Sequence, residues 1–300
     1  MTASDEHAER FTLLRPLLFT IAYEILGSAT ESDDVLQDSY LRWAQVNLST
    51  VRDTKSYLAQ LVTRQALNAL RTGARRREDY VGPWLPEPLL LDEHDPSADV
   101  VLAESVSMAM LVLLETLNPD ERAVFVLREV FGFDYGDIAD AVDKPVPAVR
   151  QIAHRAREHI QARRRRFGPV DPQQNARIAA EFMTAASSGD VAAVVSMLAP
   201  DVVWTADGGG KATAARRPVV GAEKVAAAVV GLLRLSRRIA DLRMETVVCN
   251  SAPAVLFYSA GNLDGVYILE IVDGKITNFY AVRNPDKLAA TASARAISRI

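Results

Sequence analysis

The chain has 300 residues, of which 49% are hydrophobic and 24% are charged, with a formal net charge of −4. This length predicts two or three domains, and the apolar content is sufficient for sizeable cores. The acidic average does not exclude nucleic-acid binding, because local basic surfaces decide that contact. Residues 140–166 carry eight basic against three acidic side chains, and residues 64–78 carry five against one.

Cysteine and membrane signals are nearly absent from the sequence. The single cysteine, Cys249, lies in an apolar run and is predicted to be a buried small side chain. No stretch approaches the ~18 apolar residues of a membrane span, and the N-terminus is polar and acidic. The sequence therefore predicts a cytoplasmic protein with no membrane contact, no metal site and no cofactor.

Three helices are predicted in the first 80 residues. The first covers about residues 6–27, and Ser32 is predicted to cap a second that runs from Asp33 to about Trp43. One face of this second helix carries Asp33, Asp34, Gln37 and Asp38. That face is either ordinary solvated surface or a docking face for a basic partner.

The third helix starts near Asp53, continues past Arg71 and ends in the basic run Arg75-Arg76-Arg77. Such a helix suits the binding of melted DNA, because its basic side chains can follow the phosphate backbone while a pocket of the protein accepts an unpaired base. An amphipathic helix with a solvated basic tip is the alternative.

Residues 80–100 are predicted to be a linker because they are rich in proline. They contain the segment Trp84-Leu85-Pro86-Glu87-Pro88. Since linkers seldom expose an indole, Trp84 is predicted to be buried against another part of the protein.

Residues 118–166 predict a helix-turn-helix. Asn118-Pro119-Asp120-Glu121 has the composition of a capped helix start, and further helices are predicted from Asp134 to Val142 and from about Val146 toward Gln161. Arg150, Gln151, His154 and Arg155 mostly face outward on the last helix, where arginine and glutamine can make bidentate contacts to bases. The basic run at residues 163–166 would neutralise phosphates. A helical hairpin with a solvated charged end is the alternative.

The composition changes after a boundary at Gly168, Pro169 and Pro172. Helices are predicted at 174–187, from Gly189-Asp190 onward and at 222–235. Strands are predicted at 202–206, 243–249, 254–260, 265–272 and 275–283, with hairpin turns at Asp264-Gly265 and Asp273-Gly274. Residues 207–211 are predicted to be a flexible hairpin tip. This order predicts an α+β domain whose curled sheet wraps helices and encloses a pocket.

Several of these segments resemble one known family. Residues 10–80 and 108–160 resemble the two defining regions of bacterial extracytoplasmic-function sigma factors, and residues 174–288 resemble a SnoaL-like domain of the nuclear-transport-factor-2-like fold. The combination is similar to a sigma-factor group with a fused tail. Its linker signature stands here as residues 84–88, and its tail signatures stand as Asp207-Gly208-Gly209-Gly210-Lys211 and Asn284-Pro285-Asp286-Lys287-Leu288.

The resemblance implies a multidomain fold with two all-α units and one α+β unit. A region 2 helical bundle would occupy residues 1–80, a linker 81–107, a region 4 helix-turn-helix 108–167, and a SnoaL-like cone 174–300. The linker and tail signatures would form a regulatory contact between domains.

The resemblance also implies partners and residue roles. Asp33, Asp34, Gln37 and Asp38 would contact the β′ clamp helices of core RNA polymerase. The −10 promoter element would be read by α-helical residues around Arg64, Asn68, Arg71, Arg75, Arg76 and Arg77. The −35 element would be read by Arg150, Gln151, His154, Arg155 and Arg157. Whether the pocket of the tail also binds a small-molecule ligand stays open.

Three residues depart from the family pattern. Asn68 stands where aspartate is usual, Asp143 where glycine is usual in the turn, and Pro145 where serine or threonine usually caps the recognition helix. The lost cap leaves open where that helix starts, and with it which residues reach bases.

The favoured function is an alternative sigma factor that directs promoter-specific transcription initiation, as in stress responses, without covalent chemistry. A ligand-sensing helix-turn-helix regulator stays open, although it does not explain the second basic helix or the acidic face. A SnoaL-like enzyme fused to a DNA-binding module also stays open. However, no histidine lies in residues 174–300, and carboxylates such as Asp201, Asp207 and Asp264 are typical of turns.

Overall fold

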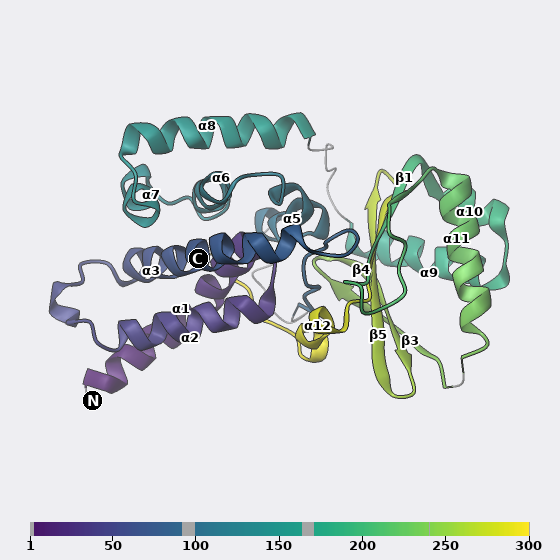
Figure 1. Ribbon diagram of the computed structural model, residues 1–300, viewed down its shortest axis with the longest axis horizontal. Coiled ribbons are helices and arrows are strands. Elements are labelled where there is room, and N and C mark those ends of the chain that lie inside the picture. The colour runs from purple at the N-terminus through teal and green to yellow at the C-terminus, as the bar shows by residue number, and fades with distance from the viewer. Residues whose placement is uncertain (1–2, 92–99, 164–170, 240, 300) are drawn as a thin grey trace.

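The computed structural model describes residues 3–91, 100–163, 171–239 and 241–299. Helices fill one side of the molecule and a sheet with its own helices fills the other, as Figure 1 shows. The basic side chains at 75–77 and most of the 163–166 run lie outside the described side chains.

Three long helices form the N-terminal unit: α1 (Ala3–Leu26), α2 (Ala29–Trp43) and α3 (Thr54–Glu78), with the 3-10 turn η1 (Leu48–Thr50) before α3. The prediction that Ser32 caps α2 was wrong. Gly27, with a φ of 69°, ends α1, so the next residue, Ser28, is free to cap α2 and accepts a hydrogen bond from the Glu31 N–H at 3.0 Å. Ser32 is buried inside the helix and donates to the Ser28 carbonyl at 2.6 Å.

The helix-turn-helix unit is built from shorter helices: α4 (Val100–Ser105), α5 (Met108–Leu114), α6 (Pro119–Phe125), the π-turn η2 (Val126–Val130), α7 (Tyr135–Val142) and α8 (Val146–Arg163). The predicted helix start at Asn118 is confirmed, because Asn118 and Glu121 form a reciprocal capping box. Asp143 ends α7 with a φ of 55°, so an aspartate takes the left-handed conformation for which glycine is usual.

The two helical units share one apolar core. Buried Leu18 of α1 and Val62 of α3 belong to the same cluster as Val124 of α6 and Ile138 of α7. Ala290 and Ile297, from the last residues of the chain, belong to this cluster too. The C-terminal end therefore returns to the helical side of the molecule, where Figure 1 places the letter C.

The tail contains one six-stranded sheet in the order β2-β1-β6-β5-β4-β3. Its strands are β1 (Leu198–Asp207), β2 (Val219–Val220), β3 (Arg243–Cys249), β4 (Ala252–Ser259), β5 (Asn262–Val272) and β6 (Lys275–Val282). Strands β3 to β6 form the predicted antiparallel meander, whereas β1 pairs with β6 in parallel. The predicted turn at Asp264-Gly265 was wrong. The chain turns at Ala260-Gly261, both with positive φ as a tight hairpin turn requires.

Strands β4 to β6 are buried on both faces of the sheet. Helices α9 (Pro172–Ser188), α10 (Val191–Met197) and α11 (Ala222–Ser236) cover one face, which presents Val255, Phe257, Tyr267, Leu269, Phe279 and Ala281. The alternate residues Ala254, Leu256, Val266, Ile268, Tyr280 and Val282 face the other way and pack with Leu85, Met108 and Leu288. Since successive strand residues point to opposite faces, these apolar runs put the linker and α5 against the second face.

Candidate interdomain site and DNA-contacting surfaces

Asp207, the last residue of β1, is the centre of the contact between tail and linker. Its carboxylate accepts hydrogen bonds from the Tyr80 hydroxyl at 2.5 Å and from the Leu85 N–H at 2.8 Å. Lys287 of helix α12 (Pro285–Leu288) forms an ion pair with it at 2.7 Å and donates to the Leu85 carbonyl at 2.6 Å. The prediction of a flexible tip was wrong for Asp207, which is fully buried. Burial is tolerated because these donors and the cation satisfy its charge.

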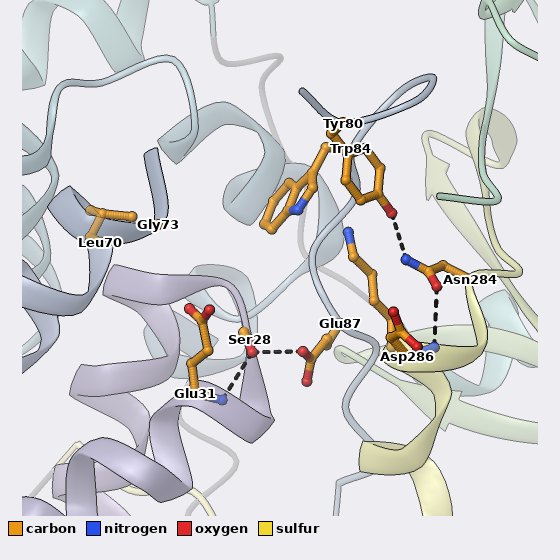
Figure 2. Close-up of a pocket in the computed structure, with 10 residues that line it drawn as sticks. Ser28, Glu31, Leu70, Gly73, Tyr80, Trp84, Glu87, Asn284 and Asp286 are labelled. Carbon is orange, nitrogen blue, oxygen red and sulfur yellow. Dashed lines mark hydrogen bonds between the residues drawn. The ribbon is translucent and has the colours of Figure 1, made fainter. Parts of the chain in front are cut away.

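The two tail signatures also contact each other. Asn284 caps α12 through the Asp286 N–H and donates to the Tyr80 hydroxyl at 2.7 Å, as Figure 2 shows. Lys211 forms an ion pair with Asp286. Gly209 has a φ of 55°, and a Cβ there would lie 2.3 Å from the Asn284 amide nitrogen. Gly209 therefore lets Asn284 of the second signature approach closely.

Glu87 attaches the other end of the linker segment to the N-terminal unit. Its carboxylate accepts from the Ser28 hydroxyl at 2.6 Å and from the Thr30 N–H at 3.0 Å, and its carbonyl accepts from the Tyr23 hydroxyl at 2.7 Å. A carboxylate is favourable here because the first N–H groups of α2 carry partial positive charge. Residues 84–88 thus hold the tail through Leu85 and the N-terminal unit through Glu87.

A cavity of about 270 Å³ lies at this junction, with Glu31, Gly73, Tyr80, Trp84 and Lys287 among its lining residues (Figure 2). Trp84 forms part of its wall and is only half-buried, so the prediction of a buried indole was wrong. Residues 85–88 of the segment are buried, with Leu85 at 1% exposure and Glu87 at 7%. Trp84 still contacts two partners: its ring lies 4.1 Å from the Lys287 amine and against Gly27.

Sequence reasoning missed Asn250, which links three parts of the molecule. It lies in the turn between β3 and β4, is fully buried, and has a φ of 50°. Its amide donates to the Tyr23 hydroxyl and to the Val106 carbonyl, both at 2.8 Å, while its oxygen accepts from the Leu89 N–H at 2.9 Å. The Asn250-Ser251 pair signals a turn in the sequence, but nothing local signals its distant partners.

The acidic face of α2 lies largely open. Asp34, Gln37 and Asp38 are exposed, as the predicted docking face requires. Asp33 differs, because it pairs with Arg15 of α1 at 3.0 Å and with Arg295 near the C-terminal end at 2.8 Å.

The basic residues of α3 lie against the helix-turn-helix unit. Arg64 donates to the Asp140 carbonyl at 2.5 Å, and Arg71 forms an ion pair with Asp120 at 2.7 Å. Lys144 lies 3.1 Å from the same carboxylate. Burial raises the pKa of Asp120, but hydrogen bonds from Arg71 and Lys144 outweigh it and lower the pKa below its usual range. Asn68 is exposed beside these contacts.

Helix α8 presents the predicted reading residues to solvent. Arg150, Gln151, His154 and Arg155 are exposed, whereas Val149, Ile152, Ala153 and Ala156 are buried. Arg157 is different, because it forms an ion pair with Glu129 at 2.6 Å. That contact ties α8 to η2 and occupies the guanidinium. Four of the five residues are therefore exposed to solvent, and the fifth contacts η2.

Aliphatic side chains and aromatic rings pack together in the interior of the tail. Phe279 lies 6.2 Å from Phe182 and 5.9 Å from Tyr267, between ring centroids. Cys249 is buried, as predicted, and burial raises the pKa of its thiol to about 12. Within the described residues, no cluster of three histidine, cysteine or acidic side chains could hold a metal ion, and no helix is long and apolar enough to cross a membrane.

Two family models match the helical half of the chain. The model described as "Sigma-70 region 2" matches residues 11–76, and the model described as "Sigma-70, region 4" matches residues 107–160. The first range contains α2 and most of α3, and the second contains α5 to α7 and most of α8.

Full-length relatives extend the match across the tail. The chain is 35% identical to the ECF RNA polymerase sigma factor SigJ of Mycobacterium tuberculosis, over 94% of this chain and 93% of that one. It is 30% identical to a probable ECF RNA polymerase sigma factor, SigI, of the same organism, over 96% and 97%. The crystal structure of M. tuberculosis SigJ superposes with a TM-score of 0.73 at 29% identity, covering 94% of this chain and 98% of that one. The chain therefore belongs to the extracytoplasmic-function family of RNA polymerase sigma factors, as a member with a C-terminal domain of helices and one sheet.

Proposed function

We propose that this alternative sigma factor contacts core polymerase through the acidic face of α2 and promoter DNA through α3 and α8. The exposed carboxylates of α2 suit a basic partner, and the exposed arginines of α8 suit base edges and phosphates. In this proposal α2 meets the β′ clamp helices, α3 the −10 element and α8 the −35 element. Its site of action is then the cytoplasm, where polymerase and promoters meet.

In our proposal, the structure is a closed form that must open before both promoter elements can be read. The names of the elements place them about 25 base pairs apart, which is about 85 Å of duplex at 3.4 Å per base pair. Here α3 packs directly against α7 of the helix-turn-helix. Arg64 and Arg71 are engaged with Asp140 and Asp120. Those arginines can neutralise phosphates only after the two units separate.

The tail acts, in this proposal, as a built-in regulator that holds the linker. This role is supported by a network around Leu85. Asp207 accepts a hydrogen bond from the Leu85 N–H, Lys287 donates to the Leu85 carbonyl, and the two side chains form an ion pair. Glu87, two residues on, grips the start of α2. Residues 84–88, near the start of the linker, are therefore held by the tail and by the N-terminal unit at once. In this proposal, a change that breaks the contacts of Leu85 or Glu87 alters how far region 4 can move from region 2.

The enzyme alternative has weaker support. SnoaL-like catalysts would need general acid–base groups, and the four histidines, His7, His94, His154 and His159, all lie outside residues 174–300. Asp207 is committed to Lys287 and the linker. We therefore propose that the tail contributes contact rather than catalysis.

A binding assay with core polymerase tests the proposal. The double change Asp34→Lys and Asp38→Lys reverses two exposed charges of α2 that no other domain contacts in the described structure. Because like charges would then face a basic partner, we expect the Kd for core polymerase to rise at least ten-fold with an unchanged circular dichroism spectrum. Glu181→Lys, on the exposed surface of α9, is the control. Wild-type affinity in the double variant would contradict the assignment of this face.

A further inference from the structure

Residues 290–299 do not stay with the tail domain. After α12, a 3-10 turn (Ala289–Ala292) leads residues 293–299 to the N-terminal unit. We call residues 290–299 the C-terminal strap. The N-terminal and helix-turn-helix units both touch this strap, and Figure 1 shows its end among their helices.

The strap is anchored by backbone hydrogen bonds and a buried side chain. The Arg295 N–H donates to the Leu90 carbonyl at 2.9 Å, and the Ser298 N–H donates to the Thr20 hydroxyl at 3.1 Å. Ile297 is 7% exposed and packs into the core shared by the helical units. Arg299 reaches the Val130 carbonyl in η2 at 3.5 Å. These contacts join the linker, α1 and the helix-turn-helix unit.

The strap also takes one carboxylate of the proposed polymerase-contacting face. Arg295 approaches Asp33 as a fork, with its two terminal nitrogens 2.8 Å and 3.4 Å from the two carboxylate oxygens. The guanidinium lies 5.4 Å from the Phe19 ring. Asp33 keeps 29% exposure and Arg295 keeps 30%, so the pair lies at the edge of the face where another cation can compete.

We propose that the C-terminal strap is an intramolecular competitor of core polymerase, which occupies Asp33 in the free protein and is released when polymerase binds. The proposal rests on the function proposed above for the acidic face of α2. A carboxylate that already receives an arginine fork cannot receive a second one in the same geometry, so the two partners exclude each other at Asp33. Release would also free the Val130 contact, and so polymerase binding would weaken one of the ties across the closed form.

The strength of this competition follows from the exposure of the pair. A partly exposed ion pair contributes a few tenths to about 1 kcal/mol, and 1.4 kcal/mol corresponds to a factor of ten. Arg295→Ala should therefore tighten binding of the full chain to core polymerase about two- to five-fold. The variant keeps Ile297 and both backbone hydrogen bonds, so the fold is retained.

Arg15→Ala is the matched control. Arg15 binds the same carboxylate at 3.0 Å, but it belongs to α1 and holds no part of the strap. Because Arg15→Ala leaves the Arg295 fork on Asp33 in place, only Arg295→Ala should tighten binding. Equal tightening by both variants, or none by Arg295→Ala, would overturn the proposal.

Hydrogen exchange of the wild-type chain gives a second readout that needs no variant. The Arg295 and Ser298 amides are hydrogen-bonded in the free protein. We expect both to exchange at least ten-fold faster in the complex with core polymerase, whereas protection that persists in the complex would overturn the strap proposal. Asp34→Lys separates the two levels of the argument, because Asp34 is exposed and the strap's arginine fork binds Asp33 instead. Suppose that Asp34→Lys weakens polymerase binding, but the Arg295 and Ser298 amides of the wild-type chain stay protected in the complex. The assignment of the acidic face is then supported, and only the strap proposal is overturned.

Discussion

Replacing Asp207 by alanine should release the tail from the linker. The change removes the acceptor of hydrogen bonds from Tyr80, Leu85 and Gly209 and takes the carboxylate away from the buried Lys287 amine. Breaking a buried ion pair by removing one partner costs about 3–5 kcal/mol. At 1.4 kcal/mol per factor of ten, the population of the undocked state should rise by at least about a hundred-fold.

Limited proteolysis of the linker at residues 80–91 measures that population, because a docked linker is protected from cleavage. Asp264→Ala is the matched control. It removes another carboxylate of the same sheet, one that pairs with Arg283 but keeps 43% exposure, so it should cost at most about 1 kcal/mol.

A double-mutant cycle sharpens the assignment. Lys287→Met removes the cation, and the combination of Lys287→Met with Asp207→Ala leaves neither charge buried. The double variant should therefore be less destabilised than the sum of the two single changes, by about 1–3 kcal/mol. If Asp207→Ala raises cleavage of the linker no more than Asp264→Ala does, the buried ion pair does not hold the linker. That result would contradict the proposal that the tail regulates the protein by holding the linker.

Three other changes test separate parts of the molecule. Trp84→Ala removes the ring that contacts Lys287 and Gly27, so it should speed proteolytic cleavage of the linker. It should also change transcription from the promoter in the same direction as removal of the tail. If cleavage and transcription are both unchanged, the linker is a passive tether. Arg150→Ala should cost about 1–3 kcal/mol at one promoter position, whereas charge removal within residues 163–166 should weaken binding to all sequences and flatten its salt dependence; identical behaviour across promoter variants would exclude base reading by Arg150. Burial raises the pKa of Glu24 to about 8, although a hydrogen bond from Ser105 and the charge of Arg122 act to lower it. Between pH 4.5 and about 8 the folded state therefore keeps a proton on Glu24 that the unfolded state has released. Stability should therefore fall as pH rises from about 4.5 to 8, and Glu24→Gln should remove that fall in thermal unfolding; an unchanged slope would show that Glu24 is not its source.

Most of the local structure could be predicted from the sequence. The capping box at Asn118, the helix-turn-helix and the β3 to β6 meander all follow from residues within a few positions of one another. The errors occurred where two local signals compete. Ser28 and Ser32 both suit a cap, and Ala260-Gly261 and Asp264-Gly265 both suit a turn, so only the packed backbone decides between them.

The sequence also indicated which segments matter without indicating what they contact. The linker and tail signatures stand out by composition, yet the Asn284 to Tyr80 hydrogen bond joins residues separated by 204 positions. Leu85, rather than the conspicuous Trp84, is enclosed, because the sheet offers an apolar face to leucine and the junction beside Trp84 stays hollow. A residue's own chemistry does not specify which distant surface will cover it.

By itself, the sequence determined the three units, their helices and strands, the basic helices and the family to which the chain belongs. Those features are encoded by periodicity, caps and short motifs, which act over a few residues. Only the tertiary structure decided that β4 to β6 are buried on both faces, that Asp207 is a buried ion-pair partner and that Arg64, Arg71 and Asp33 are already engaged within the chain. The physical reason is that burial and pairing depend on surfaces that the fold brings together. A charged side chain therefore binds whichever opposite charge or hydrogen-bond partner the packing places beside it.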